Sequence, residues 1–162
     1  MKSVPASAFK NPVHFLAIGL GSGAAPKAPG TFGTLAAVLL YIPLSWLTVP
    51  LYAGLVLAAT LLGIYLCDRT ARDWKVHDHS AIVWDEFVGF WITMLAVPVT
   101  WYWVLAGFAL FRLFDIWKPW PIRHLDEQVH GGLGIMIDDI VAGILSCGCL
   151  HGLVFLLGRN PF

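Results

Sequence analysis

The fold of this chain depends on residues 85–115, which read DEFVGFWITMLAVPVTWYWVLAGFALFRLFD. The run 87–111 contains no Asp, Glu, Lys or Arg, and it follows the acidic pair Asp85-Glu86. A membrane crossing takes about 20 apolar residues, so this run holds one crossing but not two. One crossing would separate Asp85-Glu86 from the second acidic pair, Asp138-Asp139, by the whole bilayer. If the two pairs share a site, the run must be a shallow hairpin bent at Pro98.

The composition predicts a single membrane-associated domain spanning residues 1–162. The chain is 58% hydrophobic and only 12% charged, whereas soluble domains are typically about 25% charged. This shortage of charge indicates contact with lipid. The formal net charge is zero and no basic stripe or nucleic-acid motif occurs, so we expect no nucleic-acid partner.

The apolar stretches are long, rich in Leu, Ala and Trp, and lack sustained alternation, which favours helices over strands. We therefore predict an all-α fold, a compact bundle of about six helices with apolar hairpins in contact with the membrane. A second hairpin would cover residues 34–66, bent between Pro43 and Pro50. This arrangement places nine of the ten Lys and Arg on one face, all but Arg159, which suits a cytoplasmic surface. The predicted helices are 33–47, 51–73, 84–97, 101–117 and 137–157, with a short one near 12–20.

The segment 77–86 reads HDHSAIVWDE and ends in the first acidic pair. Carboxylates set against apolar sequence are costly unless they bind a cation or a partner charge. Asp85 and Glu86 are therefore candidate metal ligands. Helix capping is the alternative, because the helix dipole favours acids in a first turn, and the sequence leaves both interpretations open. His77 and His79 have the spacing of an HxH metal-ligand pair, but imidazoles before a helix are more often surface or hydrogen-bonding groups.

The segment 111–122 reads FRLFDIWKPWPI and carries three charges at helical spacing. Arg112, Asp115 and Lys118 recur at i, i+3 and i+6, so on a helix they share one face. Such a row is commonly a surface salt-bridge ladder. Here every intervening residue is apolar, which favours a polar face directed inward at a phosphate or a metal. Arginine offers a planar fork to phosphate and lysine a point charge.

Two glycine-containing segments complete the candidate site. Residues 130–139 read HGGLGIMIDD, in which Gly132 and Gly134 belong to a predicted turn that allows close backbone approach to a ligand. Residues 28–34 read APGTFGT, where backbone N–H groups near Gly30 and the hydroxyls of Thr31 and Thr34 are candidates to hold an anion. A rigid turn with Thr as the N-cap is the alternative.

Carboxylate ligands suit Mg²⁺ far better than zinc, and the basic residues with the glycine and threonine loop suit phosphate. The combined interpretation is metal-assisted phosphate chemistry on a lipid. A small ion-binding membrane transporter is the alternative, although it would need acids at mid-depth rather than at the ends of apolar runs. A non-catalytic membrane scaffold would leave both acidic pairs without a purpose.

Together these motifs resemble the phosphatidylglycerophosphatase A family over roughly residues 12–150. The matching motifs are PGTFG at 29–33, HDHSAIVWDE at 77–86, FRLFDIWKPWPI at 111–122 and VHGGLGIMIDDIVAG at 129–143. The resemblance implies Mg²⁺-dependent removal of the terminal phosphate of phosphatidylglycerophosphate, giving phosphatidylglycerol and inorganic phosphate. It also implies an all-α fold with a central helix surrounded by others. The expected location is the bacterial inner (cytoplasmic) membrane, with the active site facing the cytoplasm.

Carried over to this sequence, the resemblance implies a set of acidic metal ligands and two basic catalytic residues, Arg112 and Lys118. A carboxylate or His130 would act as general base, and the choice between them stays open. The expected partners are the phospholipid substrate and the membrane, with a homo-oligomer left open. The acidic positions are Asp78, Asp85, Glu86, Asp115, Asp138 and Asp139.

Overall fold

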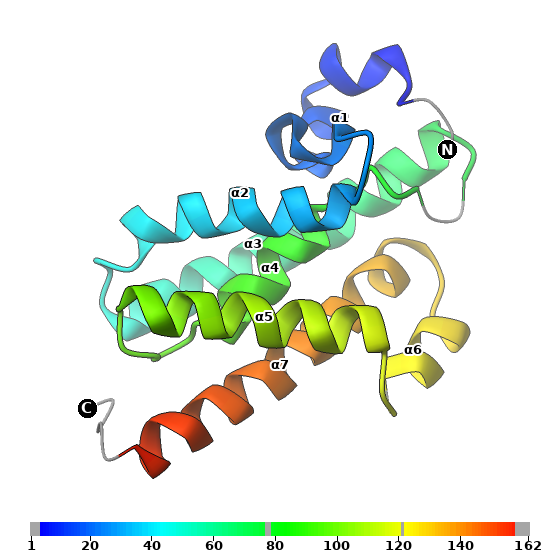
Figure 1. The fold of residues 1–162 in the computed structure, drawn as a ribbon. Coiled ribbons are helices and arrows are strands. Elements are labelled where there is room, and N and C mark those ends of the chain that lie inside the picture. Colours follow the sequence, from blue (N-terminus) through cyan, green and yellow to red (C-terminus); the bar gives the residue numbers. More distant parts are fainter. Residues whose placement is uncertain (1–3, 77–78, 121, 158–162) are drawn as a thin grey trace.

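The structure is a computed structural model that describes residues 4–76, 79–120 and 122–157, with the backbone alone at 125–127. Within these residues the regular secondary structure is helical and contains no strand, as predicted. The elements, shown in Figure 1, are η1 (Ala6–Phe9), α1 (Pro12–Ala17), η2 (Gly19–Ala24), α2 (Pro29–Leu44), α3 (Val49–Asp73), α4 (Trp84–Thr93), α5 (Trp101–Trp117), α6 (Ile122–Gln128) and α7 (Gly131–Leu156).

Two helical hairpins define the architecture. Helix α2 turns back into α3, and α4 turns back into α5, with both connections at the same end of the molecule (Figure 1). The ten residues of α4 span only about 15 Å, half of a typical hydrocarbon core. The run 87–111 is therefore a hairpin, with Pro98 in its connection, and not a single crossing. As a result, α2, α4 and α7 begin, and α5 ends, at the opposite end of the bundle.

Helix α4 is the central helix that the family resemblance implied. It packs against α2, α3, α5 and α7, and its Phe87, Val88 and Phe90 are fully buried. Its closest approach to α7 depends on two glycines, since a Cβ on Gly143 would meet the carbonyl oxygen of Gly89. This contact holds the start of α4 beside the third turn of α7, which carries Asp138 and Asp139. The two acidic pairs thus meet although 52 residues separate Glu86 from Asp138 in the sequence.

The predicted helix bounds hold for α5 and need correction elsewhere. Helix α2 begins at Pro29, four residues before the predicted start, because the fixed φ of proline suits a first helical position. Helix α4 ends at Thr93 and not at 97. The predicted glycine turn before Asp138 is wrong, since α7 already begins at Gly131. A Cβ on Gly132 would meet the carbonyl oxygen of Ile64, so this glycine permits close packing on α3 rather than a turn.

The outer surface of the bundle is apolar enough for a membrane. In the described part of the chain, α3 and α7 are each long and apolar enough to cross one. Only 28% and 33% of their most apolar stretches are buried inside the protein, so most of these side chains face outward. Trp46 and Trp101 are exposed at the end that carries the hairpin connections. These surfaces support association with a membrane.

Candidate active site

A cavity of about 300 Å³ opens at the end of the bundle where α2, α4 and α7 begin and α5 ends. It receives residues from four of the segments that the sequence singled out. Both acidic pairs face it, together with Arg112 of α5 and Lys118 just beyond the end of α5, so the site brings together groups from four helices, α2, α4, α5 and α7. Its lining consists of Ala28, Pro29, Gly30, Ser80, Ile82, Asp85, Glu86, Arg112, Asp115, Lys118, Asp138 and Asp139.

Three carboxylates in this cavity could hold a cation. Asp115, Asp138 and Asp139 each offer one oxygen, and these oxygens all lie within 4.8 Å of one another. Asp139 is 2% exposed, and its Oδ1 has no hydrogen-bond partner among the described residues. A buried carboxylate oxygen without a partner is costly unless a cation satisfies it. The donor set, all carboxylate oxygen, fits a hard divalent ion such as Mg²⁺.

Arg112 connects Glu86 to Asp115, which is one of the three clustered aspartates. Its Nη1 donates to Asp115 Oδ2 at 2.7 Å and to Glu86 Oε2, so one guanidinium binds carboxylates of both α4 and α5. The hydroxyl of Thr34 in α2 lies 2.8 Å from the same Glu86 oxygen. A Cβ on Gly30 would meet Oε1 of Glu86, so glycine is required there for α2 to approach. The cluster is therefore tied to three helices and fixed in position.

Lys118 reaches the site from beyond the end of its helix. Helix α5 ends at Trp117, and Lys118 follows with φ 44° and ψ 58° in the left-handed region, a conformation that costs about 1–2 kcal/mol for a residue with a Cβ. Its Nζ donates to Asp138 Oδ2 at 2.7 Å. The expected row of three charges on one helical face therefore holds only for Arg112 and Asp115. The turn directs Lys118 toward α7 instead.

Comparison with known proteins identifies the family. The model of the family Phosphatidylglycerophosphatase A matches residues 15–154. The chain belongs to this family. It is 55% identical to Phosphatidylglycerophosphatase A of Escherichia coli (strain K12) over 142 residues, which cover 87% of this chain and 83% of the relative. It is 54% identical to the protein of that name in Haemophilus influenzae over 138 residues, or 84% and 85% of the two chains.

A third relative differs in name. A Bacteroides thetaiotaomicron protein with the provisional name phosphatidylinositol-3-phosphatase is 46% identical over 136 residues, covering 79% of this chain and 84% of its own. No solved structure matches the chain significantly. The chain is thus a phosphatase of phospholipid metabolism, and the transporter and scaffold alternatives are set aside.

Several predicted residues of this phosphatase lie outside the cavity lining. His130 is exposed at the start of α7, where its Nδ1 lies 3.2 Å from the carbonyl oxygen of Gln128. His79 is buried, accepts a hydrogen bond from the Ala81 N–H through Nδ1 and packs on Trp74, as a hydrogen-bonding group would. Thr31, Gly132 and Gly134 are likewise absent from the lining, and His77 and Asp78 lie outside the described residues.

The structure gives Thr34 a different role from the predicted anion contact, and it adds Ser80 and Ile82, which were not predicted. Thr34, and not Thr31, contacts Glu86, because position 34 lies one helical turn after Gly30 on the face of α2 that packs on α4. Ser80 and Ile82 line the cavity from the loop before α4. Both residues fall inside the HDHSAIVWDE segment, so membership of this motif was the sequence feature that could have indicated their place in the site. Asp85 lines the cavity, as a metal ligand would, and its Oδ1 accepts a hydrogen bond from the Glu86 N–H at 2.9 Å, as an acid in the first turn of a helix can. The structure is therefore compatible with both the metal-ligand and the capping interpretation of Asp85.

The pKa of Glu86 predicts a pH dependence of stability. Burial raises this pKa from 4.5 to about 7 and Asp115 adds to the increase, while Arg112 and Thr34 oppose it. Between these pH values the folded state keeps a proton that the unfolded chain releases, so stability falls as pH rises toward 7. We expect the Tm of the EDTA-treated phosphatase in detergent to decline over this range, and less steeply in Glu86→Gln. The same decline of Tm with pH in the wild type and in Glu86→Gln would show that Glu86 is not the group responsible.

Proposed function

We propose that this phosphatase removes the terminal phosphate of phosphatidylglycerophosphate in a Mg²⁺-dependent reaction at the cavity between α2, α4, α5 and α7. The observation that carries this proposal is the meeting of three carboxylates, Asp115, Asp138 and Asp139, with Arg112 and Lys118 in one small space. The carboxylates provide a cation site, and the two basic side chains provide contacts for a phosphate.

Each of the two basic residues has a specific part in this proposal. Arg112 and Lys118 would bind the phosphoryl oxygens and neutralise the charge that develops on them during hydrolysis. Glu86 would hold the guanidinium of Arg112 in place from the side of α4, and Thr34 would in turn hold Glu86. When bound by the three aspartates, Mg²⁺ would supply Lewis-acid polarisation of the phosphate and activation of water.

The proposed location is the bacterial inner membrane, with the cavity open to the cytoplasm. The apolar hairpin tips and the exposed flanks of α3 and α7 would enter the bilayer. The cavity lies at the end where the Lys and Arg of the described helices gather, and cytoplasmic surfaces of membrane proteins are enriched in these residues. The phosphate would thus be taken from a headgroup at the surface of the membrane, without passing through the bundle.

Metal dependence can be tested on the purified phosphatase in detergent. We expect phosphate release from phosphatidylglycerophosphate to stop after treatment with EDTA and to return when Mg²⁺ is added in excess of the chelator. Addition of Mg²⁺ should also raise the Tm of the chelated protein, because an ion that binds only the folded state stabilises it. Undiminished hydrolysis after complete removal of divalent ions would contradict the proposal.

A further inference from the structure

A second hollow adjoins the cavity at the end of α5. It measures about 500 Å³ and lies between the last residues of α5 and the first turn of α6. Lys118 belongs to the walls of both spaces, so the hollow and the cavity are neighbours. Its lining consists of Trp117, Lys118, Pro119, Trp120, Arg123 and His124.

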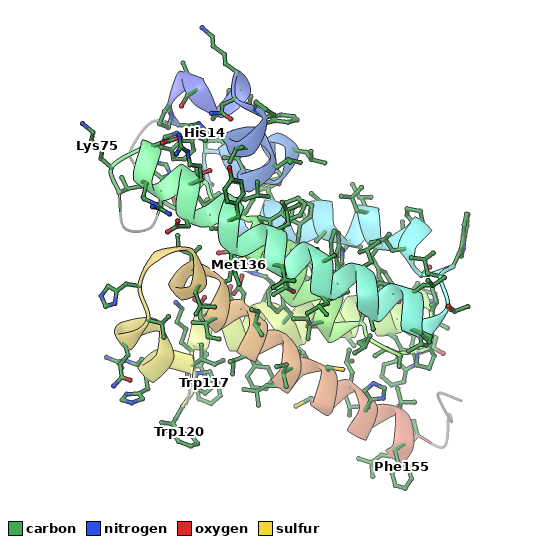
Figure 2. All side chains as sticks on the ribbon, turned by 180° about the vertical axis from the view of Figure 1, so that it is seen from behind. His14, Lys75, Trp117, Trp120, Met136 and Phe155 are labelled. Atoms are coloured by element: carbon green, nitrogen blue, oxygen red, sulfur yellow. The ribbon has the colours of Figure 1, made fainter. Side chains whose placement is uncertain are left out.

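The side chains of this hollow combine aromatic surface with nitrogen donors. Trp117 is 69% exposed and Trp120 is 85% exposed, and Figure 2 shows both projecting from the bundle near α6, far from Phe155 at the opposite end. Exposed tryptophans are typical of the membrane–water interface, where the ring enters the headgroup region. Arg123 and His124 lie in the first turn of α6 and also line the hollow. The guanidinium of an arginine has five N–H donors suited to phosphate.

The proposed substrate carries a second phosphate besides the one that is hydrolysed. Its terminal phosphomonoester is joined through one glycerol to a phosphodiester, which bears the diacylglycerol. When the monoester occupies the cavity, the phosphodiester must lie one glycerol away, in the direction of the membrane. The hollow beyond Lys118 lies next to the cavity and carries both an interfacial aromatic surface and an arginine.

We propose that the hollow between α5 and α6 binds the glycerol and inner phosphodiester of the lipid, with Arg123 as the phosphate contact. This proposal rests on the proposed function. Lys118 would then stand between the two phosphates, and Trp117 and Trp120 would mark the level of the membrane interface. The hollow would favour lipids whose monoester lies one glycerol beyond a phosphodiester over phosphatidic acid, whose monoester is joined directly to diacylglycerol.

The test is Arg123→Gln, assayed on phosphatidylglycerophosphate and on phosphatidic acid in the same detergent micelles. Loss of one charge-assisted phosphate contact should raise KM for phosphatidylglycerophosphate about tenfold with little change in kcat. Activity on phosphatidic acid should not change. The matched control is Arg69→Gln, because Arg69 on α3 is 58% exposed and lines neither space; it should behave as the wild type on both substrates.

A second measurement separates the lipid headgroup from free phosphate. Phosphatidylglycerol, which retains the phosphodiester, should inhibit the wild type and should inhibit Arg123→Gln about tenfold less well, while inhibition by inorganic phosphate stays the same. Equal losses on both substrates, an unchanged KM, or weaker inhibition by inorganic phosphate would each overturn the headgroup site. Absence of hydrolysis by the wild type would instead overturn the proposed function, and micelle binding of phosphatidylglycerol by wild type and Arg123→Gln would still test the headgroup site.

Discussion

Asp139→Asn is expected to lower phosphate release from phosphatidylglycerophosphate by about a thousandfold, the scale of losing a principal electrostatic group of an active site. Asp139 is 2% exposed, and one of its oxygens has no protein partner in the described part of the chain. Asparagine keeps the shape of the side chain but removes the charge that a divalent ion requires. We therefore expect the variant to lose the rise in Tm that Mg²⁺ gives the wild type.

The stability of the metal-free variant distinguishes a metal ligand from a structural residue. Glu86, Asp115, Asp85 and Asp138 all lie close enough to repel the Asp139 carboxylate. Removing that charge should leave the Tm of the EDTA-treated protein equal to that of the wild type or higher. The matched control is Asp73→Asn, since Asp73 binds His14 and Arg69 away from the cavity. It should lose stability and keep its activity. If Asp139→Asn likewise loses stability and keeps its activity, Asp139 is not a metal ligand.

The sequence predicted the hairpin at 87–111 only on the condition that the two acidic pairs share a site, because the length of this run excludes two crossings but allows one. Ten residues of α4 and seventeen of α5 agree with that argument. The sequence was sufficient to select the polar cluster, since carboxylates beside apolar sequence need partners. It could not predict which side chains meet. That depends on the approach of α7 to α4 at Gly89 and Gly143, a contact between segments 54 residues apart.

Short-range signals failed where tertiary packing decides the conformation. The glycines at 131–134 have the composition of a turn, yet they lie in a helix because α3 leaves room only for glycine at 132. Lys118 was expected on the face of Arg112, yet the left-handed turn at its own position redirects it to Asp138. The seven-residue helix α6 follows two prolines and has no clear apolar period, so the hollow that it forms with α5 was invisible in the sequence.

Arg112→Lys is expected to lower kcat about a hundredfold while keeping most of the stability of the protein. The guanidinium of Arg112 binds Glu86 and Asp115 together and still presents further donors to a phosphate. An ammonium keeps the charge but cannot reproduce this planar fork. Phosphate release and Tm should both be measured, with Arg69→Lys as the matched control. A kcat close to that of the wild type would show that only the charge of Arg112 matters.

Arg112→Gln separates the two parts of this role. It should lower kcat further and also reduce the free energy of unfolding by about 3 kcal/mol, because it leaves buried carboxylates without their cation. Adding Glu86→Gln should restore much of that stability, since one of the uncompensated acids is then neutral, but it should not restore activity. Recovery of stability and activity together would mean that Arg112 serves only to neutralise Glu86. Recovery of stability alone would mean that the guanidinium acts on the substrate as well as on the fold.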